Sequence, residues 1–94
     1  MSKSGSWTET VLKALKALRA DERPASLEEV YRAVKEIAPS RCDDSDVYER
    51  VVRGRKYSEP RWRRNVRDAL VKLKKRGLVV AEGQRLWKLA SPQT

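Results

Sequence analysis

Four polar residues in the stretch 60–77 carry side chains that can form paired or directional hydrogen bonds with nucleic-acid bases: Arg61, Arg64, Asn65 and Asp68. A guanidinium can donate two hydrogen bonds to guanine, an amide can bind adenine in the same bidentate manner, and a carboxylate can accept from cytosine. In a helix of about 100° per residue, these residues point away from an apolar stripe. They are therefore candidates for contacting base edges.

Each of these residues has a second interpretation. Arg61 and Arg64 can equally well contact phosphates alone, and Asn65 can bind a phosphate or simply stay in water. Asp68 can orient Arg64 through an i,i+4 ion pair, and we favour this pair over a contact with cytosine. Trp62 has the spacing of a core residue, although a tryptophan that reaches the groove can contact a base methyl group.

The positive charge of the chain is concentrated around these residues. Residues 53–76 carry eleven Lys/Arg against two Asp/Glu, giving +9, which equals the net charge of the whole 94-residue chain. A solvated helix face normally interleaves acids with its bases, whereas this stretch contains only Glu59 and Asp68. Such a concentrated excess predicts a polyanionic partner, double-stranded DNA. Residues expected to contact phosphates, or to lie in the C-terminal hairpin beside them, are Arg53, Arg55, Lys56, Tyr57, Ser58, Arg63, Arg67, Lys72, Lys75, Gln84, Arg85 and Lys88.

Other kinds of site lack the residues that they need. The chain has no histidine and one cysteine, Cys42, which excludes a Cys–His nucleophile, His-containing zinc sites and cysteine-based zinc fingers. It also lacks a Gly-rich phosphate loop, so we expect no enzymatic activity, cofactor, metal or small-molecule substrate. No apolar run approaches the roughly 20 residues of a membrane span. The single cysteine predicts a reducing compartment, which is the bacterial cytoplasm and nucleoid or the eukaryotic nucleus.

Three helices that could position the basic residues are predicted from apolar spacing, over about 7–20, 27–38 and 60–76. The apolar stripe of the third consists of Trp62, Val66, Ala69, Leu70 and Leu73. Ser58 is the candidate N-cap of this helix, and Gly77 supplies the left-handed residue after its end.

The rest of the chain completes a small α+β domain over 6–90, with flexible tails at 1–5 and 91–94. Strands over about 78–81 and 86–90 flank a short turn that contains Gly83, and they predict a β-hairpin. The expected fold is therefore a winged helix-turn-helix, with three main helices and a C-terminal hairpin as the wing.

The segment 40–59 is longer than a simple helix-turn-helix needs. Val47, Tyr48, Val51 and Val52 have a spacing that allows a short amphipathic helix, with acids at its start and Gly54 at its end. The segment can accordingly be an extra packed helix, or a basic loop that contacts a phosphate.

The pattern Trp62-x-x-Asn65-Val66-Arg67-x-x-Leu70-x-x-Leu73, followed by Gly77-Leu78-Val79 and by Gly83-x-x-x-Trp87-x-Leu89, resembles a known group of winged-helix domains. These are the reader domains of modification-dependent restriction endonucleases, namely the C-terminal domain of Dpn-type enzymes and the N-terminal domain of Mrr-like enzymes. A fainter similarity is to forkhead domains. The resemblance implies a module that selects a DNA site, in some cases one with a methylated base, while a separate nuclease domain cuts.

The sequence thus predicts a non-catalytic module that binds double-stranded DNA, with helix 60–76 in the major groove and hairpin 78–90 as a wing. The resemblance extends this to the specificity domain of a restriction endonuclease. The alternatives are a winged-helix transcription regulator and a protein-interaction domain whose basic helix docks on an acidic partner.

Overall fold

Three amphipathic helices supply the core: α1 (Trp7–Ala17), α2 (Leu27–Ile37) and α3 (Arg61–Lys75). The structure is a computed structural model that describes residues 6–83 and 85–90. The predicted helices are confirmed, with ends that differ by at most a few residues. The largest fully buried side chains come from all three helices and from the strand after them: Val11, Leu15, Val30, Val34, Val66, Leu70, Leu73 and Val79.

The helix ends follow from local hydrogen bonds. At the start of α2, the Ser26 hydroxyl accepts from the backbone N–H of Glu29 at 3.2 Å, and the Glu29 carboxylate accepts from the backbone N–H of Ser26 at 2.9 Å. At the end of α3, Gly77 has a φ of 78°, and its N–H donates to the carbonyl of Lys74 at 3.0 Å. A left-handed glycine at this position is a common helix terminator, as the sequence predicted.

A three-stranded antiparallel sheet closes one end of the domain, in the order β1-β5-β4. The hairpin β4 (Val79–Ala81) and β5 (Leu86–Leu89) was predicted, whereas β1 (Ala25–Ser26) was not. β1 pairs with β5 through Ala25 opposite Trp87, and the N–H of Leu27 donates to the carbonyl of Arg85 at 3.0 Å. The hairpin is thereby attached to the start of α2.

The segment before α3 does not form the short helix that was considered from the sequence, so that prediction is wrong. A 3-10 turn, η1 (Pro39–Arg41), is followed by strands β2 (Val47–Val52) and β3 (Arg55–Pro60), which form a separate antiparallel pair. Arg53 and Gly54 make the connection with φ values of 53° and 80°. Positive φ at both central residues is what a two-residue hairpin turn of the I′ kind requires. We call Val47–Pro60 the β2–β3 ribbon.

The ribbon also changes how α3 begins. Ser58 lies within β3, opposite Glu49, and so is not the N-cap that we expected. The cap position is taken by Pro60, which makes no side-chain hydrogen bond, and the N–H of Arg61 donates to the carbonyl of Asp46 at 2.8 Å. The first turn of α3 is therefore held by the backbone of the residue just before the ribbon.

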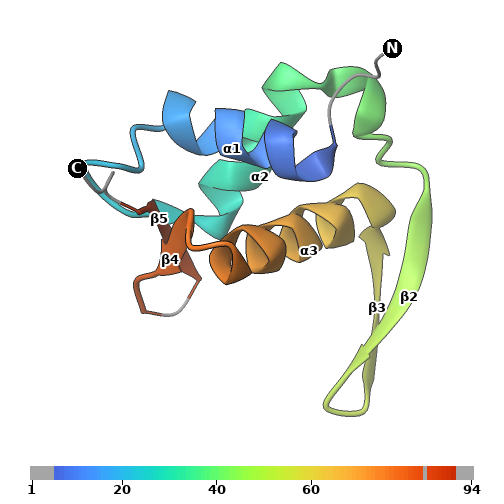
Figure 1. The fold of residues 1–94 in the computed structure, drawn as a ribbon. Coiled ribbons are helices and arrows are strands. Elements are labelled where there is room, and N and C mark those ends of the chain that lie inside the picture. The colour runs from blue at the N-terminus through green and yellow to red at the C-terminus, as the bar shows by residue number, and fades with distance from the viewer. Residues whose placement is uncertain (1–5, 84, 91–94) are drawn as a thin grey trace.

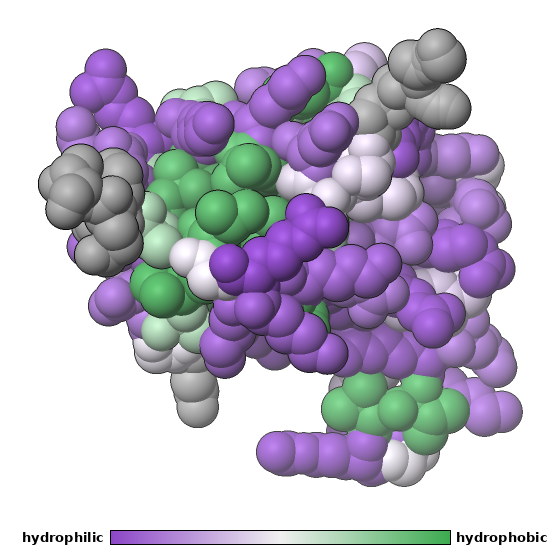
Figure 2. All heavy atoms as spheres, in the orientation of Figure 1, coloured by the Kyte–Doolittle hydropathy of each residue, from purple (hydrophilic) through white to green (hydrophobic). Residues whose placement is uncertain are grey.

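The helices and the two hairpins form a flat body with principal extents of 45 × 37 × 20 Å. Figure 1 shows α1 and α2 on one side of α3, with the β2–β3 ribbon leaving from the start of α3 and the β4–β5 hairpin from its end. Hydrophilic side chains cover most of the view around α3 in Figure 2, and a hydrophobic group lies apart from the body, near the projecting end of the ribbon. The predicted tails 1–5 and 91–94 lie outside the described residues.

Candidate nucleic-acid interface

The side of α3 opposite the core is strongly basic. Trp62, Val66, Ala69, Leu70 and Leu73 are all buried, as the sequence predicted. Arg61, Arg64, Asp68, Lys72 and Lys75 are all exposed, whereas Asn65 is half-buried at the edge of the face. The base-edge candidates therefore share one side of the helix.

Trp62 belongs to the core and not to this face. Its side chain is 4% exposed, and its ring meets that of Tyr31 edge-on with centroids 5.7 Å apart. The indole N–H donates to the carboxylate of Asp44 at 2.9 Å, so its polar atom is also engaged. The structure leaves Trp62 no free edge for contact with a base methyl group.

Arg61 and Arg64 flank the ring of Tyr48, which projects from β2. The guanidinium carbons lie 5.5 and 5.7 Å from the centroid of that ring. Arg61 also bonds the carboxylate of Asp46 at 3.5 Å, but both side chains are about half exposed, so the pair contributes little to stability. The ribbon thus positions the two arginines while leaving them accessible.

The expected ion pair between Arg64 and Asp68 is not formed in the described part of the chain. Asp68 instead lines a shallow hollow beside α1. Asn65, Lys72 and Arg76 line the same hollow, together with Trp7. Our preferred interpretation of Asp68 was therefore wrong, and Arg64 has no carboxylate partner among the described residues.

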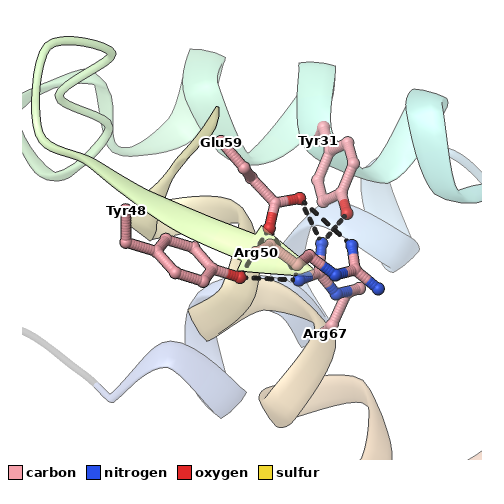
Figure 3. Close-up of polar contacts among 5 residues, drawn as sticks. All are labelled: Tyr31, Tyr48, Arg50, Glu59 and Arg67. Carbon is pink, nitrogen blue, oxygen red and sulfur yellow. Dashed lines mark hydrogen bonds and ion pairs between the residues drawn. The ribbon is translucent and has the colours of Figure 1, made fainter. Parts of the chain in front are cut away.

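Arg67 lies at the flank of α3 that faces the ribbon, and it is fully engaged within the fold. Its two terminal nitrogens donate to the two carboxylate oxygens of Glu59 at 2.6 and 2.8 Å. They also donate to the hydroxyls of Tyr31 at 3.0 Å and Tyr48 at 3.1 Å, as Figure 3 shows. A bidentate arginine–carboxylate pair is geometrically specific. We therefore assign Arg67 to holding the ribbon on α3.

The charges in this network stabilise one another. The paired hydrogen bonds from Arg67 hold the pKa of Glu59 down at about 2, outweighing the effect of burial, and the Tyr48 hydroxyl adds a bond of 2.6 Å. The hydrogen bonds to Glu59 in turn raise the pKa of Arg67. Burial raises the pKa of Tyr48, and so does its hydrogen bond to Glu59. Glu59 is therefore a carboxylate and Arg67 a cation throughout the physiological range.

A cleft of about 450 Å³ lies between the ribbon and the turn of the β4–β5 hairpin. Three arginines from three elements line it: Arg50 of β2, Arg63 of α3 and Arg85 of the hairpin turn. Arg63 stacks on Tyr31, 4.9 Å from the ring centroid, and its Nε is buried without a hydrogen-bond partner in the described part of the chain. We call this space the hairpin cleft. Its other lining residues are Val52, Tyr57, Ser58, Glu59 and Pro60.

The remaining phosphate candidates are distributed over both hairpins. Arg53, Arg55, Lys56, Tyr57 and Ser58 are all exposed on the ribbon. In the other hairpin, Arg85 is exposed and Lys88 is half-buried, while Gln84 lies outside the described residues.

Two residues of the candidate interface were missed from the sequence, Tyr48 and Arg50. Their signal was the alternation of a strand, because residues two apart in β2 share a face.

No protein-family model, curated protein or solved structure matches the chain. Within residues 6–83 and 85–90, no cluster of three or more potential metal-ligating side chains is present, and no helix is long and apolar enough to cross a membrane.

Proposed function

We propose that this chain is a winged-helix module that binds double-stranded DNA, with α3 in the major groove and the β4–β5 hairpin as the wing. The observation that carries the proposal is the exposed face of α3, on which Arg64, Lys72 and Lys75 have no carboxylate partner among the described residues. Cations left uncompensated along one helix face are the footprint of a polyanionic ligand.

The arrangement of the elements supports this proposal. α1 packs against both α2 and α3, and the β4–β5 hairpin follows α3 directly, as in a winged helix-turn-helix, with the β2–β3 ribbon inserted between α2 and α3. Arg61 and Arg64 lie in the first turns of α3, the part of a recognition helix that meets base edges. A major groove about 12 Å wide admits one α-helix. We assign base contacts to these two arginines and to Asn65, and phosphate contacts to Lys72 and Lys75.

The resemblance to endonuclease reader domains adds a further proposal, that the module selects the site for a nuclease domain. A modified-base version needs a methyl contact from a residue other than Trp62, because Trp62 is buried. The transcription-regulator version shares the same DNA-binding face.

Titration of fluorescent duplex DNA over a range of salt concentrations tests the proposal. We expect log K to fall linearly with log salt, with a slope of about −0.9 for each phosphate neutralised. Arg64→Gln is expected to lower the affinity for a selected sequence by about five- to 150-fold, which corresponds to roughly 1–3 kcal/mol, and to relax its discrimination.

The matched control is Arg19→Gln, which removes one exposed arginine that follows α1 and is not part of the basic face of α3. It is expected to bind like the wild type. Absence of binding to any duplex at low salt contradicts the proposal, and binding to an acidic peptide under the same conditions would assign the basic face to a protein partner.

A further inference from the structure

The β2–β3 ribbon extends away from the rest of the molecule beyond its base (Figure 1). Its base is anchored by Tyr48 and Glu59 through Arg67, whereas Val51 is 63% exposed and Tyr57 is 47% exposed. An isolated two-stranded hairpin is marginally stable in water. The projecting part of the ribbon therefore presents exposed side chains beyond the anchored base.

The two faces of the ribbon carry different charge. Residues directly opposite each other in an antiparallel pair share a face, and faces alternate along each strand. The register therefore puts Tyr48, Arg50 and Val52 on one face together with Glu59, Tyr57 and Arg55. Val47, Glu49, Val51, Lys56, Ser58 and Pro60 make up the other face.

The face that carries Tyr48, Arg50 and Glu59 is the inner face. Figure 3 shows Tyr48, Arg50 and Glu59 on the side of the ribbon that meets Arg67 of α3. Arg50, Val52 and Tyr57 also line the hairpin cleft, opposite Arg85 of the wing. Glu59 pairs with Arg67 and also lies 3.6 Å from the guanidinium of Arg50, so two arginines share one carboxylate and the inner face keeps a positive surplus, to which Arg55 adds.

The outer face has no such surplus, because Lys56 is balanced by Glu49 two pairs away. Among the cations of the ribbon, Arg50 lines the hairpin cleft together with Arg63 of α3, and Arg55 shares the face of Arg50 by register.

We propose that the β2–β3 ribbon is a second DNA-binding arm, whose inner face and tip contact backbone phosphates of the duplex that α3 reads. This inference rests on the proposed function. Arg50, Arg55 and the tip residue Arg53 make the contacts, and Arg63 and Arg85 continue the basic surface through the hairpin cleft to the wing. Six residues of strand span about 20 Å. At about 3.4 Å per base pair, the arm lies along roughly six base pairs of flanking DNA.

Two neighbouring residues of β3 provide the test, because Arg55 faces inwards and Lys56 outwards. Arg55→Gln and Lys56→Gln each remove one exposed positive charge, and neither residue has an ion pair among the described residues. Binding to a duplex with at least ten flanking base pairs is measured against salt for both variants. Arg55→Gln is expected to reduce the salt slope by about 1 and to weaken binding about five- to tenfold near 0.1 M salt. Lys56→Gln is expected to leave both unchanged.

The tip is tested separately with Arg53→Asn, which removes a charge while producing an Asn-Gly turn that suits positive φ at both positions. In a hydroxyl-radical footprint, the double variant Arg53→Asn/Arg55→Gln is expected to lose protection only on the flanking backbone and to keep the protection due to α3. Thermal unfolding of each variant confirms that the fold is retained.

The outcomes separate the two proposals. If Arg64→Gln weakens binding while Arg55→Gln and Arg53→Asn keep the wild-type slope and footprint, the second arm is overturned and the function of α3 stands. Equal losses of affinity for Arg55→Gln and Lys56→Gln also overturn the proposal of a second arm. They would show that a charge on either face of the ribbon has the same effect. If the wild type binds no duplex, both proposals fall.

Discussion

The arginines of α3 have the same side chain, but their positions around the helix give them different tasks. Arg64 points away from the core, where its guanidinium lies over the ring of Tyr48, 5.7 Å from the centroid. Arg67 lies about 60° further round the helix, towards the ribbon and Tyr31, where Glu59 and two hydroxyls are within hydrogen-bond distance. Its side chain is 25% exposed and that of Glu59 only 14%. One arginine is therefore available to a ligand, and the other is part of the fold.

Replacing these two arginines separates stability from binding. Arg67→Ala leaves the carboxylate of Glu59 and the hydroxyls of Tyr31 and Tyr48 without their shared donor, so we expect a loss of about 2–4 kcal/mol in the free energy of unfolding. Arg64→Ala removes no such contact and is expected to change the free energy of unfolding by less than about 0.5 kcal/mol. Urea denaturation followed by circular dichroism measures both. Equal stability losses would show that the network does not hold the ribbon.

At this scale, the sequence predicts burial better than it predicts partners. The core positions of α3, Trp62 among them, follow from helical spacing alone and are confirmed. The role of Arg67 could not be predicted, because its partners come from α2 and both strands of the ribbon, and only the tertiary fold brings these together. The hypothesis of an Arg64–Asp68 pair was wrong for a related reason, since correct i,i+4 spacing does not oblige two exposed side chains to meet.

Among the elements, the helices and the C-terminal hairpin were predictable because several local signals agree for each. α2 has helical spacing together with the Ser26–Glu29 capping box, and α3 has its stripe together with Gly77. In the ribbon, the signals conflict. The spacing of Val47, Tyr48, Val51 and Val52 fits a helix, but β-branched residues favour strands and Arg53-Gly54 fits a two-residue hairpin turn. Pairing with β3 decides the outcome, and periodicity within one segment cannot show it.

The turn of the ribbon has a specific conformational requirement. Gly54 has a φ of 80°, and a Cβ added there meets no atom within 4 Å, so the cost of Gly54→Ala is confined to the backbone. We expect this cost to be about 1 kcal/mol. The projecting part of the ribbon makes few contacts with the core. Its amides should therefore exchange about fivefold faster in Gly54→Ala than in the wild type, with no change in the core of α3.

Amide hydrogen exchange followed by NMR measures this local effect. Arg53→Asn is the control in the opposite direction, because it favours the same turn and should slow exchange in the ribbon. Acceleration spread evenly over α1 and α3 would mean that the ribbon is not an independent unit of opening.

For the whole molecule, the network around Glu59 joins segments that are distant in the sequence. Tyr31 belongs to α2, Tyr48 and Glu59 to the ribbon, and Arg67 to α3 (Figure 3). The network thereby fixes the ribbon relative to the face of α3, as the proposed binding of both to one duplex would require. The total charge predicted a polyanionic partner, but the positions of the charges depend on this assembly and could not be predicted from the sequence.

The stability of the whole fold should therefore depend on the ionisation of Glu59. Its pKa is about 2 in the folded chain, against an ordinary value of 4.5, because Arg67 and Tyr48 stabilise the carboxylate. A lowered folded pKa means that the stabilisation is complete above about pH 4.5 and is lost as the pH falls towards 2. The shift corresponds to roughly 3 kcal/mol. The pKa values of Glu29 and Asp44 are also lowered by their hydrogen bonds, so they add to the loss in acid.

Glu59→Gln isolates the contribution of this one carboxylate. The variant is expected to be less stable than the wild type by about 2–3 kcal/mol at pH 7, with a difference that shrinks steadily between pH 4.5 and pH 2 as Glu59 becomes protonated in the wild type. Glu49→Gln removes an exposed carboxylate from the outer face of the same ribbon and serves as the control. Its free energy of unfolding is expected to change with pH as that of the wild type does. Urea denaturation at a series of pH values measures all three proteins. The stability difference between the wild type and Glu59→Gln could instead stay constant down to pH 2. That result would contradict the ion pair, because protonated Glu59 would then stabilise the fold as much as the carboxylate does.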